Sequence, residues 1–471
     1  METVNQPGSK QAVSSNVQLF TVPKTDTSMK GYRILDFMPV SDNLTPAEFL
    51  ITSTDSFVDL SRSYFAADVQ LVKNDGNAIA DADTLFPTPG LIHTMIKQFT
   101  VHWNGTLINP QSDTYPFKWY INTVLNYTPQ EGNTILQPEG WFPQTASTGL
   151  VPLDFPVPLT ANNINTTANG GDGHADYAGL SDEQKSAVLA SHKEKAKYTN
   201  KKWNTFYFKP MHEVFYMGEV VPPGIEMRFT FKFHEPNFYL NGVGAEGKLG
   251  KDHLKLRFYL CQLTLSPTLY KQIESARHSG RQDVKYAAVR SDVRVFTLGT
   301  GETRFNESNL FQSRIPDRMV VGLLHPNSYN GDYTYHPYAF QKFGVQEMKQ
   351  LIHGEEYPYR TLELTHNSNQ KDMNGYWRFL QAAGFVAKGK ACMITPEMWG
   401  HGHSCTLFMF DNTANGDADG PMLNPRQKGD VRLEFTLGAA QNHAINVLIW
   451  GEFENILTVD PNGAVLYDIY S

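Results

Sequence analysis

Apolar and polar residues alternate along many short stretches of this chain, and turn-forming residues separate the stretches. The clearest example occupies every second position of one run: Ile225, Met227, Phe229, Phe231 and Phe233. A period of two places these side chains on one face of a β-strand. Similar texture predicts further strands at 57–65, 68–73, 95–103, 203–209 and 253–265. In the second half the same texture predicts strands at 286–289, 293–298, 319–324, 406–410, 431–437, 444–450 and 464–467.

Turn residues punctuate this pattern. Asn104 and Gly105 separate two apolar stretches, and an Asn-Gly pair in that position is the strongest short-range indication of a β-hairpin. The sequence Asn74-Asp-Gly predicts another turn. Many short strands joined by turns favour antiparallel sandwiches over a parallel sheet with crossover helices.

Three segments have helical character instead. Ser266 and Pro267 supply an N-cap and a first-turn proline for a short helix reaching about Arg277. The run from Met373 to Leu380 places Tyr376, Phe379 and Leu380 on one helical face. Ser181 and Gln184 form a capping-box pattern that opens a charged, alanine-rich helix over about 182–198.

These signals predict an all-β chain with two β-sandwiches in tandem, long loop insertions and a few short helices. The expected organisation, from the N-terminus onward, is a flexible arm at 1–28, a first sandwich at 29–266, a linker helix and turn at 267–284 and a second sandwich at 285–471. Residues 128–200 are rich in Pro, Gly, Asn and Thr, and are expected to be a loop insertion of the first sandwich that carries the 182–198 helix.

Composition narrows the class of protein. Hydrophobic residues make up 41% of the chain and charged residues 19%, which excludes an intrinsically disordered chain. The net charge of -8 disfavours nucleic-acid coating, so no specific nucleic-acid binding is expected. Three cysteines make a disulfide framework a poor hypothesis. The first residues lack the apolar core of a secretory signal, so the protein is expected to be made inside the cell and not secreted.

Four segments in order carry a family resemblance. Residues 115–127 have a tyrosine-rich sequence that leads into a turn, and residues 221–229 have a Pro-Gly turn into a strand. The third segment comprises 309–323, 329–333 and 336–340, and the fourth comprises 405–411, 429–435 and 453–460. Together they resemble the double jelly-roll major capsid proteins of eukaryotic DNA viruses, in particular the Polinton/Maverick and adintovirus type and, more distantly, the adenovirus hexon. Gln312 and His336 depart from the pattern, which has glycine and asparagine there.

The resemblance implies that both sandwiches are jelly rolls and that the protein is a major capsid protein of the virion. It implies a homotrimer, in which six lobes form a pseudo-hexagonal capsomer that tiles an icosahedral shell. The expected partners are the chain itself, neighbouring capsomers, penton and minor capsid proteins and, through the outer loops, a host receptor. The arm at 1–28 would point inward and the 128–200 loop outward.

Two clusters have the residue types of a metal site. His401, His403 and Cys405 alternate, which would direct all three side chains to one face of a strand, but no fourth ligand is apparent. The acidic and glycine-rich segment 411–420 resembles a calcium loop, but Met422 stands where such a loop has its glutamate. A solvated turn is the better interpretation of that segment, and no metal or cofactor is expected.

The candidate catalytic and binding residues can also be explained by structural roles. Paired carboxylates suit glycoside hydrolysis only at the right separation, which a sequence does not show. These pairs are Glu355-Glu356 and Asp417/Asp419. Cys261 lies in an apolar strand and is expected to be a core residue. The aromatic pairs Trp119-Tyr120 and Tyr376-Trp377 suit sugar stacking, but are expected to fill a core or an interface. No catalytic residue is expected.

Three functions remain in competition. A capsid subunit should trimerise and form closed shells. A tandem β-sandwich carbohydrate-binding or attachment protein should bind sugars as a small oligomer. A sandwich hydrolase should lose turnover when its acidic pairs are substituted. The ordered resemblance favours the capsid subunit, and the protein is not expected to be an enzyme.

Overall fold

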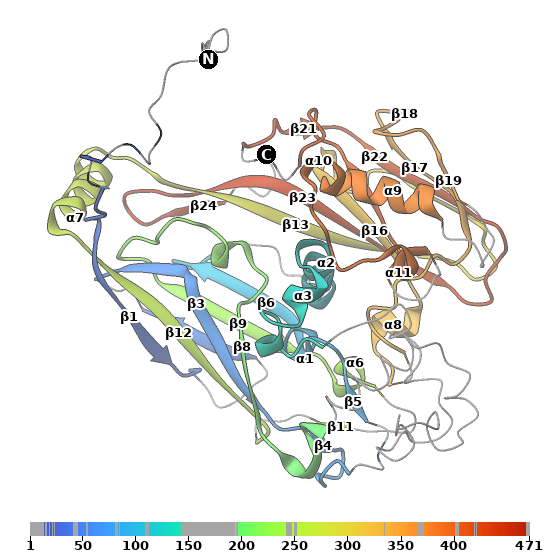
Figure 1. The fold of residues 1–471 in the computed structure, drawn as a ribbon, viewed down its shortest axis with the longest axis horizontal. Helices are drawn as coiled ribbons and strands as arrows, with labels where there is room; N and C mark the ends of the chain where they lie inside the picture. Colours follow the sequence, from blue (N-terminus) through green and yellow to red (C-terminus); the bar gives the residue numbers. More distant parts are fainter. Residues whose placement is uncertain are drawn as a thin grey trace.

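The computed structural model of the 471-residue chain describes most of the protein. The described ranges are 24–40, 46–52, 55–80, 85–108, 113–142, 196–241, 247–248, 252–333, 335–364, 372–400, 405–418 and 422–467, with isolated positions between them. Strands that precede helix α7 (Pro267–Glu274) and strands that follow it form separate sheets. We name these two sets lobe 1 (residues 29–265) and lobe 2 (residues 284–467); they lie side by side in Figure 1.

Lobe 1 contains two four-stranded antiparallel sheets. One has the order β1-β12-β3-β8, formed by Met29–Phe37, Leu254–Leu265, Phe57–Val69 and Asn204–Phe208. The other has the order β2-β9-β6-β7, formed by Ala47–Ile51, Met227–Phe233, Ile96–Trp103 and Thr106–Leu107. Two short pairs extend the lobe: β4 (Val72–Lys73) with β11 (Gly247–Lys248), and β5 (Phe86–Pro87) with β10 (Leu240–Asn241).

Lobe 2 repeats this arrangement. Its first sheet has the order β13-β23-β16-β20, formed by Val284–Leu298, Ile445–Val459, Arg318–Leu324 and Leu407–Asp411, with β24 (Val465–Tyr467) paired to β23. Its second has the order β14-β22-β17-β18, formed by Arg304–Glu307, Val431–Leu437, Val345–Ile352 and Glu355–Glu356, with β19 (Leu362–Glu363) paired to β17. A further pair joins β15 (Arg314–Ile315) to β21 (Gln427–Lys428).

The strand orders define the architecture. In each lobe the opening strand pairs with a long strand near the lobe's end, β1 with β12 and β13 with β23, and the second strand belongs to the other sheet, where β2 pairs with β9 and β14 with β22. Two four-stranded sheets connected in this way form a jelly roll. The predicted fold class, all-β with two tandem jelly rolls and a few short helices, is therefore confirmed.

Several predicted elements have different bounds. The sequence predicts two strands, at 57–65 and 68–73, but β3 runs without a break from Phe57 to Val69. β13 likewise joins two expected strands, and β23 continues nine residues past 450 to Val459. Strands β2, β14 and β17 were not expected. In β17, polar Gln346, Glu347 and Lys349 obscure the apolar alternation.

The sequence pattern predicted two of the described helices, α7 and α9 (Met373–Ala382), and missed a third, α2 (Tyr115–Asn126). Helix α7 begins as predicted, with the Ser266 side chain accepting a hydrogen bond from Leu269 N, 3.4 Å away. Helix α9 is also confirmed. Helix α2 was missed because nine of its twelve residues are buried, and its other residues, Lys118, Asn122 and Asn126, form only a narrow polar stripe. The helix expected at 182–198 lies outside the described residues except for its last positions.

The remaining helical segments are short. They are α1 (Leu91–Met95), α3 (Pro129–Gly132), α6 (Pro236–Tyr239), α8 (Pro326–Asn330), α10 (Phe385–Lys388), α11 (Pro396–Gly400), η2 (Gln137–Glu139), η3 (Thr199–Lys201), η4 (Glu213–Phe215) and the π-helical turn η5 (Ser275–Ser279). Within the described part of the chain, no helix is long and apolar enough to cross a membrane.

Positive φ angles at two turns account for the residue types that the sequence has, or the family pattern has, at those positions. Asn104 and Gly105 both have positive φ, 45° and 80°, and they join β6 to β7 through the pair Trp103 and Thr106, as the Asn-Gly signal predicts. Gln312 also has a positive φ of 55°. A side chain is strained in that region and glycine is not, which gives a physical reason for glycine in the family pattern at this position.

The core of lobe 1 is built from aromatic rings. Phe65 on β3 stacks on Phe258 of β12 with ring centroids 4.3 Å apart and meets Phe231 of β9 edge-on at 5.0 Å. The corresponding strands of lobe 2 bury mainly aliphatic side chains, among them Val321, Leu323 and Ile449. The two cores are continuous, since one cluster of buried apolar residues contains members of both lobes.

Candidate functional site

The junction between the lobes is the most elaborate feature that joins distant parts of the chain. Helix α2, near the centre of Figure 1, belongs to lobe 1 but presents its aromatic side chains to lobe 2. Tyr120 stacks on Tyr338 with ring centroids 4.2 Å apart and planes within 5°. Phe117 stacks on Tyr329 at 5.4 Å. Rings packed this closely hold the lobes at a fixed relative orientation.

Polar contacts cross the same junction. The hydroxyls of Thr94 and Tyr338 lie 2.8 Å apart, and the Tyr120 hydroxyl lies 3.5 Å from the sulfur of Cys405. Three asparagine side chains of lobe 1 donate to backbone carbonyl oxygens of lobe 2: Asn104 to Gly463, Asn237 to Gly331 and Asn241 to Tyr335, over 2.7, 2.8 and 3.0 Å. Hydrogen bonds made in this way between the two lobes favour one relative arrangement of the surfaces that carry them.

A buried carboxylate lies where the two lobes meet. Glu213 accepts a hydrogen bond from the Tyr467 hydroxyl over 3.0 Å, and Lys118 Nζ lies 3.8 Å from its other oxygen. Burial alone raises the pKa of Glu213, but His212, Lys118 and the hydrogen bonds outweigh it and hold the pKa below its usual value. Burial lowers the pKa of the adjacent His212 to about 4, so this histidine is neutral at pH 7. The arrangement is an internal ion pair, and no pattern in the sequence predicts it.

A groove of about 420 Å³ opens beside this carboxylate. Its walls come from α2 and the 211–217 segment of lobe 1 and from β13, β16 and β23 of lobe 2. Its charged groups are paired within each lobe: Lys118 with Glu213 in lobe 1, and Arg318 with Glu452 in lobe 2 through a 2.6 Å contact. A groove whose charges already neutralise each other has no surplus charge with which to select an ionic ligand.

Of the three candidate metal ligands, the structure describes only Cys405, because His401 and His403 lie outside the described residues. Cys405 is fully buried, next to Tyr120 at the lobe junction. Burial raises the pKa of its thiol to about 12, which opposes the thiolate form that binds metals. Among the residues that the structure describes, no group of three or more histidine, cysteine or acidic side chains could hold a metal ion.

The calcium-like segment uses its acidic groups to form a turn. Asp411 accepts hydrogen bonds from the backbone and the hydroxyl of Thr413, over 2.9 and 2.6 Å, and from Ala418 N over 3.2 Å. Asp417 forms an ion pair with Lys388 over 2.6 Å. Asp419 lies outside the described residues. The contacts of Asp411 and Asp417 fit the interpretation of this segment as a turn between strands.

The other acidic pair and the isolated cysteine also have structural contacts. Glu356 accepts hydrogen bonds from the backbone and the hydroxyl of Thr361, over 2.8 and 2.9 Å, and its neighbour Glu355 is exposed. Cys261 is buried on β12, and its backbone N–H donates to the Ser63 hydroxyl over 2.9 Å. Burial raises the pKa of the Cys261 thiol, which makes it a poor nucleophile.

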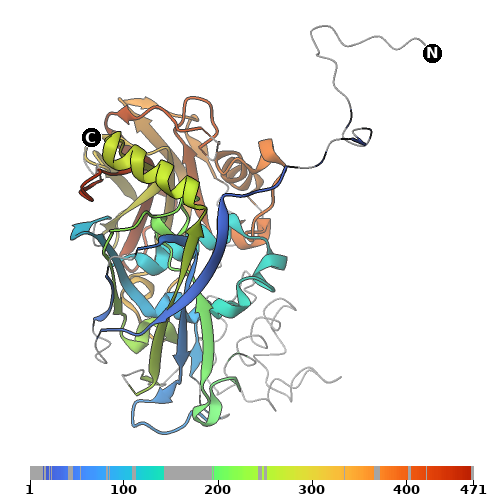
Figure 2. The same cartoon turned by 90° about the vertical axis from the view of Figure 1, so that its left-hand side faces the viewer.

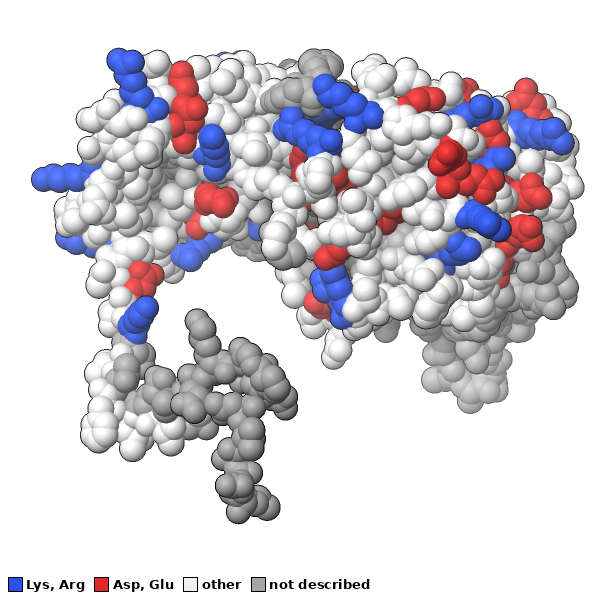
Figure 3. All heavy atoms as spheres, turned by 90° about the horizontal axis from the view of Figure 1, so that it is seen from above, with Lys and Arg blue, Asp and Glu red and all other residues white. Residues whose placement is uncertain are grey.

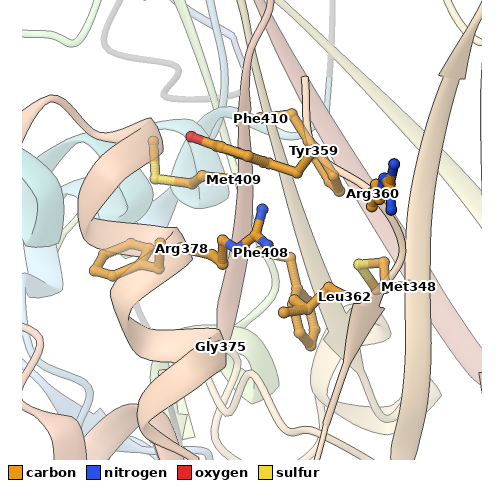
Figure 4. A pocket seen from close by; sticks show the side chains of 10 residues that line it. Met348, Tyr359, Arg360, Leu362, Gly375, Arg378, Phe408, Met409 and Phe410 are labelled. Atoms are coloured by element: carbon orange, nitrogen blue, oxygen red, sulfur yellow. The ribbon is translucent and has the colours of Figure 1, made fainter. Parts of the chain in front are cut away.

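The aromatic pairs divide between core and surface. Trp119 stacks on His93 at 4.6 Å and is buried, as is Tyr120. Tyr376 donates from its hydroxyl to the Ile394 carbonyl oxygen over 2.9 Å, whereas its neighbour Trp377 is half exposed. Near α9, Arg378 lies over the ring of Tyr359 at 4.5 Å and beside Phe408 in a small apolar pocket, shown in Figure 4. That pocket has room for about one water molecule.

Basic side chains gather at one place in lobe 2, around Asp292. Arg290, Arg294 and Arg314 approach its carboxylate to 3.8, 3.0 and 3.9 Å. The ring of Phe453 lies 4.9 Å from the guanidinium of Arg314. On the face seen in Figure 3, basic and acidic side chains are interspersed, so that face carries no broad patch of a single sign.

Comparisons with known proteins agree with this architecture. No protein-family model matches the chain. The uncharacterized protein F54H12.2 of Caenorhabditis elegans is 21% identical over 450 residues, which cover 93% of this chain and 97% of the nematode protein. A chain in the cryo-EM structure of the Sputnik virophage matches with a TM-score of 0.58 and 12% identity, over 100% of this chain and 96% of that one.

Two further solved structures extend the comparison. A chain of the PBCV-1 virus capsid matches with a TM-score of 0.53 and 10% identity, over 96% of this chain and 100% of that one. The Faustovirus major capsid protein matches with a TM-score of 0.51 and 9% identity, over 94% of this chain and 92% of that one. The chain therefore has the double jelly-roll fold of viral major capsid proteins. The resemblance predicted from four segments of its sequence is confirmed for the fold.

Proposed function

We propose that this protein is a major capsid protein whose copies assemble into a virus shell. The observation that carries the proposal is the pair of jelly rolls joined by a buried junction, with Tyr120 stacked on Tyr338. A shell subunit has to present the same lateral surfaces in every copy. Two lobes that shared only a flexible linker would not do so, because their relative orientation would vary. The match over almost the whole length of solved capsid chains supports the same role.

The finer organisation of the particle follows from this role. Three copies with two lobes each form a homotrimeric, pseudo-hexagonal capsomer, and capsomers contact one another in an icosahedral shell. Residues 1–28 form the arm, 29–266 and 285–471 the two rolls, and 267–284 the linker between them. Penton and minor capsid proteins complete the shell, and the outer loops, including 128–200, meet a host receptor. The subunit is synthesised in the host cell, binds no specific nucleic acid, cofactor or metal, and has no catalytic site.

The mass of the purified chain in solution tests the proposal. Light scattering should give about three times the 53.1 kDa of one chain, and negative-stain images should show pseudo-hexagonal particles or closed shells. A second candidate, a carbohydrate-binding or attachment protein, draws support from the half-exposed Trp377. A glycan array separates the two, because sugar binding by a monomer or dimer that forms no shells would replace the capsid proposal.

A further inference from the structure

The large apolar side chains exposed in this protein are concentrated near its N-terminus. Among the described residues 23 such side chains are exposed, and nine of them lie between positions 17 and 40. We name this set the N-terminal apolar strip. Its members are Val17, Leu19, Phe20, Val22, Met29, Tyr32, Ile34, Met38 and Val40. An apolar set this dense on one short segment marks a contact surface rather than the scattered exposure normal for a soluble chain.

The strip includes an edge strand. β1 pairs with β12 on one side, and among the described residues no strand pairs with it on the other. Tyr32 and Ile34 lie two positions apart, so they share a face of β1, and they are 66% and 46% exposed. Figure 2 shows β1, in dark blue, running along the outside of lobe 1. An unpaired edge with apolar side chains is a template for association with another chain.

The corresponding strand of lobe 2 is a control within the molecule. β13 occupies the same place in its sheet as β1, and it too pairs with only one neighbour among the described strands. Both strands carry charged side chains, but they differ in apolar exposure. The nine residues of β1 include three exposed large apolar side chains, Met29, Tyr32 and Ile34, whereas the fifteen of β13 include one, Val289. Of the two equivalent edges, the one at β1 is therefore the more apolar.

Charge favours a second copy of this chain as the partner. Between positions 17 and 40, Lys24, Lys30 and Arg33 outnumber Asp26 and Asp36 by one positive charge, whereas the whole chain has a net charge of -8. Two acidic chains repel each other overall, and contact through a slightly basic segment reduces that repulsion. A segment of this sign suits the acidic surface of another copy.

We propose that β1 and the N-terminal apolar strip form the contact through which one copy of this chain binds a second copy. This inference rests on the proposed function and adds which surface is used. The strip of one copy lies against an adjacent copy, so that Tyr32, Ile34 and the free edge of β1 are covered in the assembly. The equivalent edge of β13 stays outside this contact.

Paired substitutions test the assignment. Tyr32→Lys together with Ile34→Lys places two charges on the exposed face of β1, and Val289→Lys places one on β13, where Val289 is 55% exposed. Light scattering on each purified chain, with urea unfolding as a check on the fold, gives the readout. The β1 variant should be a folded monomer over a concentration range in which the wild type and Val289→Lys are oligomers. Oligomers of unchanged mass in the β1 variant would overturn the assignment and leave the capsid function standing.

Amide hydrogen exchange on the wild-type chain covers the case in which the β1 variant does not fold. Edge amides of residues 30–36 should exchange slowly in the oligomer and become faster when dilution releases monomers, while those of β13 keep one rate. Equal exchange of residues 30–36 in both states would contradict the assignment. A wild-type chain that is monomeric at every concentration would instead contradict the proposed function itself.

Discussion

The two lobes have the same strand order but different chemistry at equivalent places. In lobe 1, β3 and β12 face each other through Phe65 and Phe258, which are stacked rings. In lobe 2 the equivalent strands β16 and β23 face each other through Arg318 and Glu452, a buried ion pair. A jelly roll therefore needs apolar alternation and turns in the right order, but not a particular core. The core can be aromatic in one roll and aliphatic with a buried ion pair in the other.

Acid should produce the largest difference between the lobes. Burial lowers the pKa of His212 and His234 in lobe 1 to about 4 and about 3, and that of His336 in lobe 2 to about 4. Because the folded values lie below the unfolded value of 6.5, these groups contribute full stability above pH 6.5 and lose it as the pH falls toward 4. Each changes the unfolding free energy by about 1.4 kcal/mol per pH unit in that window.

Urea unfolding at several pH values between 7.5 and 4.5 measures this effect. His234→Gln should reduce the slope of stability against pH by about 1.4 kcal/mol per unit, since it removes one of the three histidines. Stability that does not change across this range would show that the histidines are not buried as described.

Core substitutions should show that the stability of lobe 1 depends on its packed aromatic rings. Phe65→Ala removes a ring that meets several others and should cost about 4 kcal/mol, whereas Leu323→Ala, at a buried site in lobe 2, should cost about 3 kcal/mol. Chemical denaturation of both variants provides the comparison. A larger loss for Leu323→Ala would mean that the aliphatic core carries more of the stability.

The ion pair of lobe 2 offers a sharper test. Glu452→Ala removes the carboxylate that lies 2.6 Å from the buried Arg318 guanidinium and should destabilise the protein by about 3 kcal/mol. Glu434→Ala is the matched control, since Glu434 forms more exposed pairs with Lys349 and Arg432, and it should cost less than about 1 kcal/mol. Equal losses in the two variants would show that the buried pair is no stronger than a surface pair.

The smallest expected effect is a gain. Gln312→Gly in lobe 2 relieves a positive φ and should stabilise the protein by about 0.5 to 1 kcal/mol, measured as a shift in the urea midpoint. Glu347→Gly in strand β17 is the control and should destabilise by a similar amount, because Glu347 is paired with Thr436 and Glu363 and glycine weakens a regular strand. A loss at position 312 would indicate that the Gln312 side chain stabilises its turn.

The sequence predicted the architecture well where local signals were strong. Strict alternation indicated β9, the Asn104-Gly105 pair indicated the β6–β7 hairpin, and Ser266-Pro267 indicated the start of α7. Strands with mixed composition, such as β17, were missed because polar residues alternate only weakly with apolar ones. Helix α2 was missed because both lobes bury most of it, which leaves the narrow stripe Lys118, Asn122 and Asn126 in place of the broad polar face of a surface helix.

The lobe junction was beyond prediction for a different reason. Its contacts join residues far apart in the chain, such as Glu213 with Tyr467 and Asn104 with Gly463. Each looks ordinary in its own neighbourhood, and only the packing of the two lobes brings the partners together. The family resemblance did mark 115–127 and 336–340, the segments that meet through Tyr120 and Tyr338, but it gave no physical reason for their pairing.

The pairing of the opening strand of each lobe with a late one sets the order of events during synthesis. β1 meets its partner β12 only when residues 254–265 have left the ribosome, and β13 waits for residues 445–459. At roughly 5–20 residues per second, lobe 1 would be complete roughly 10 to 40 s before lobe 2. During that interval Phe117 and Tyr120 have no rings of lobe 2 to cover them. The nascent chain therefore passes through a partly folded state with exposed aromatic side chains. On crowded polysomes, chaperones would be needed at that stage to prevent aggregation.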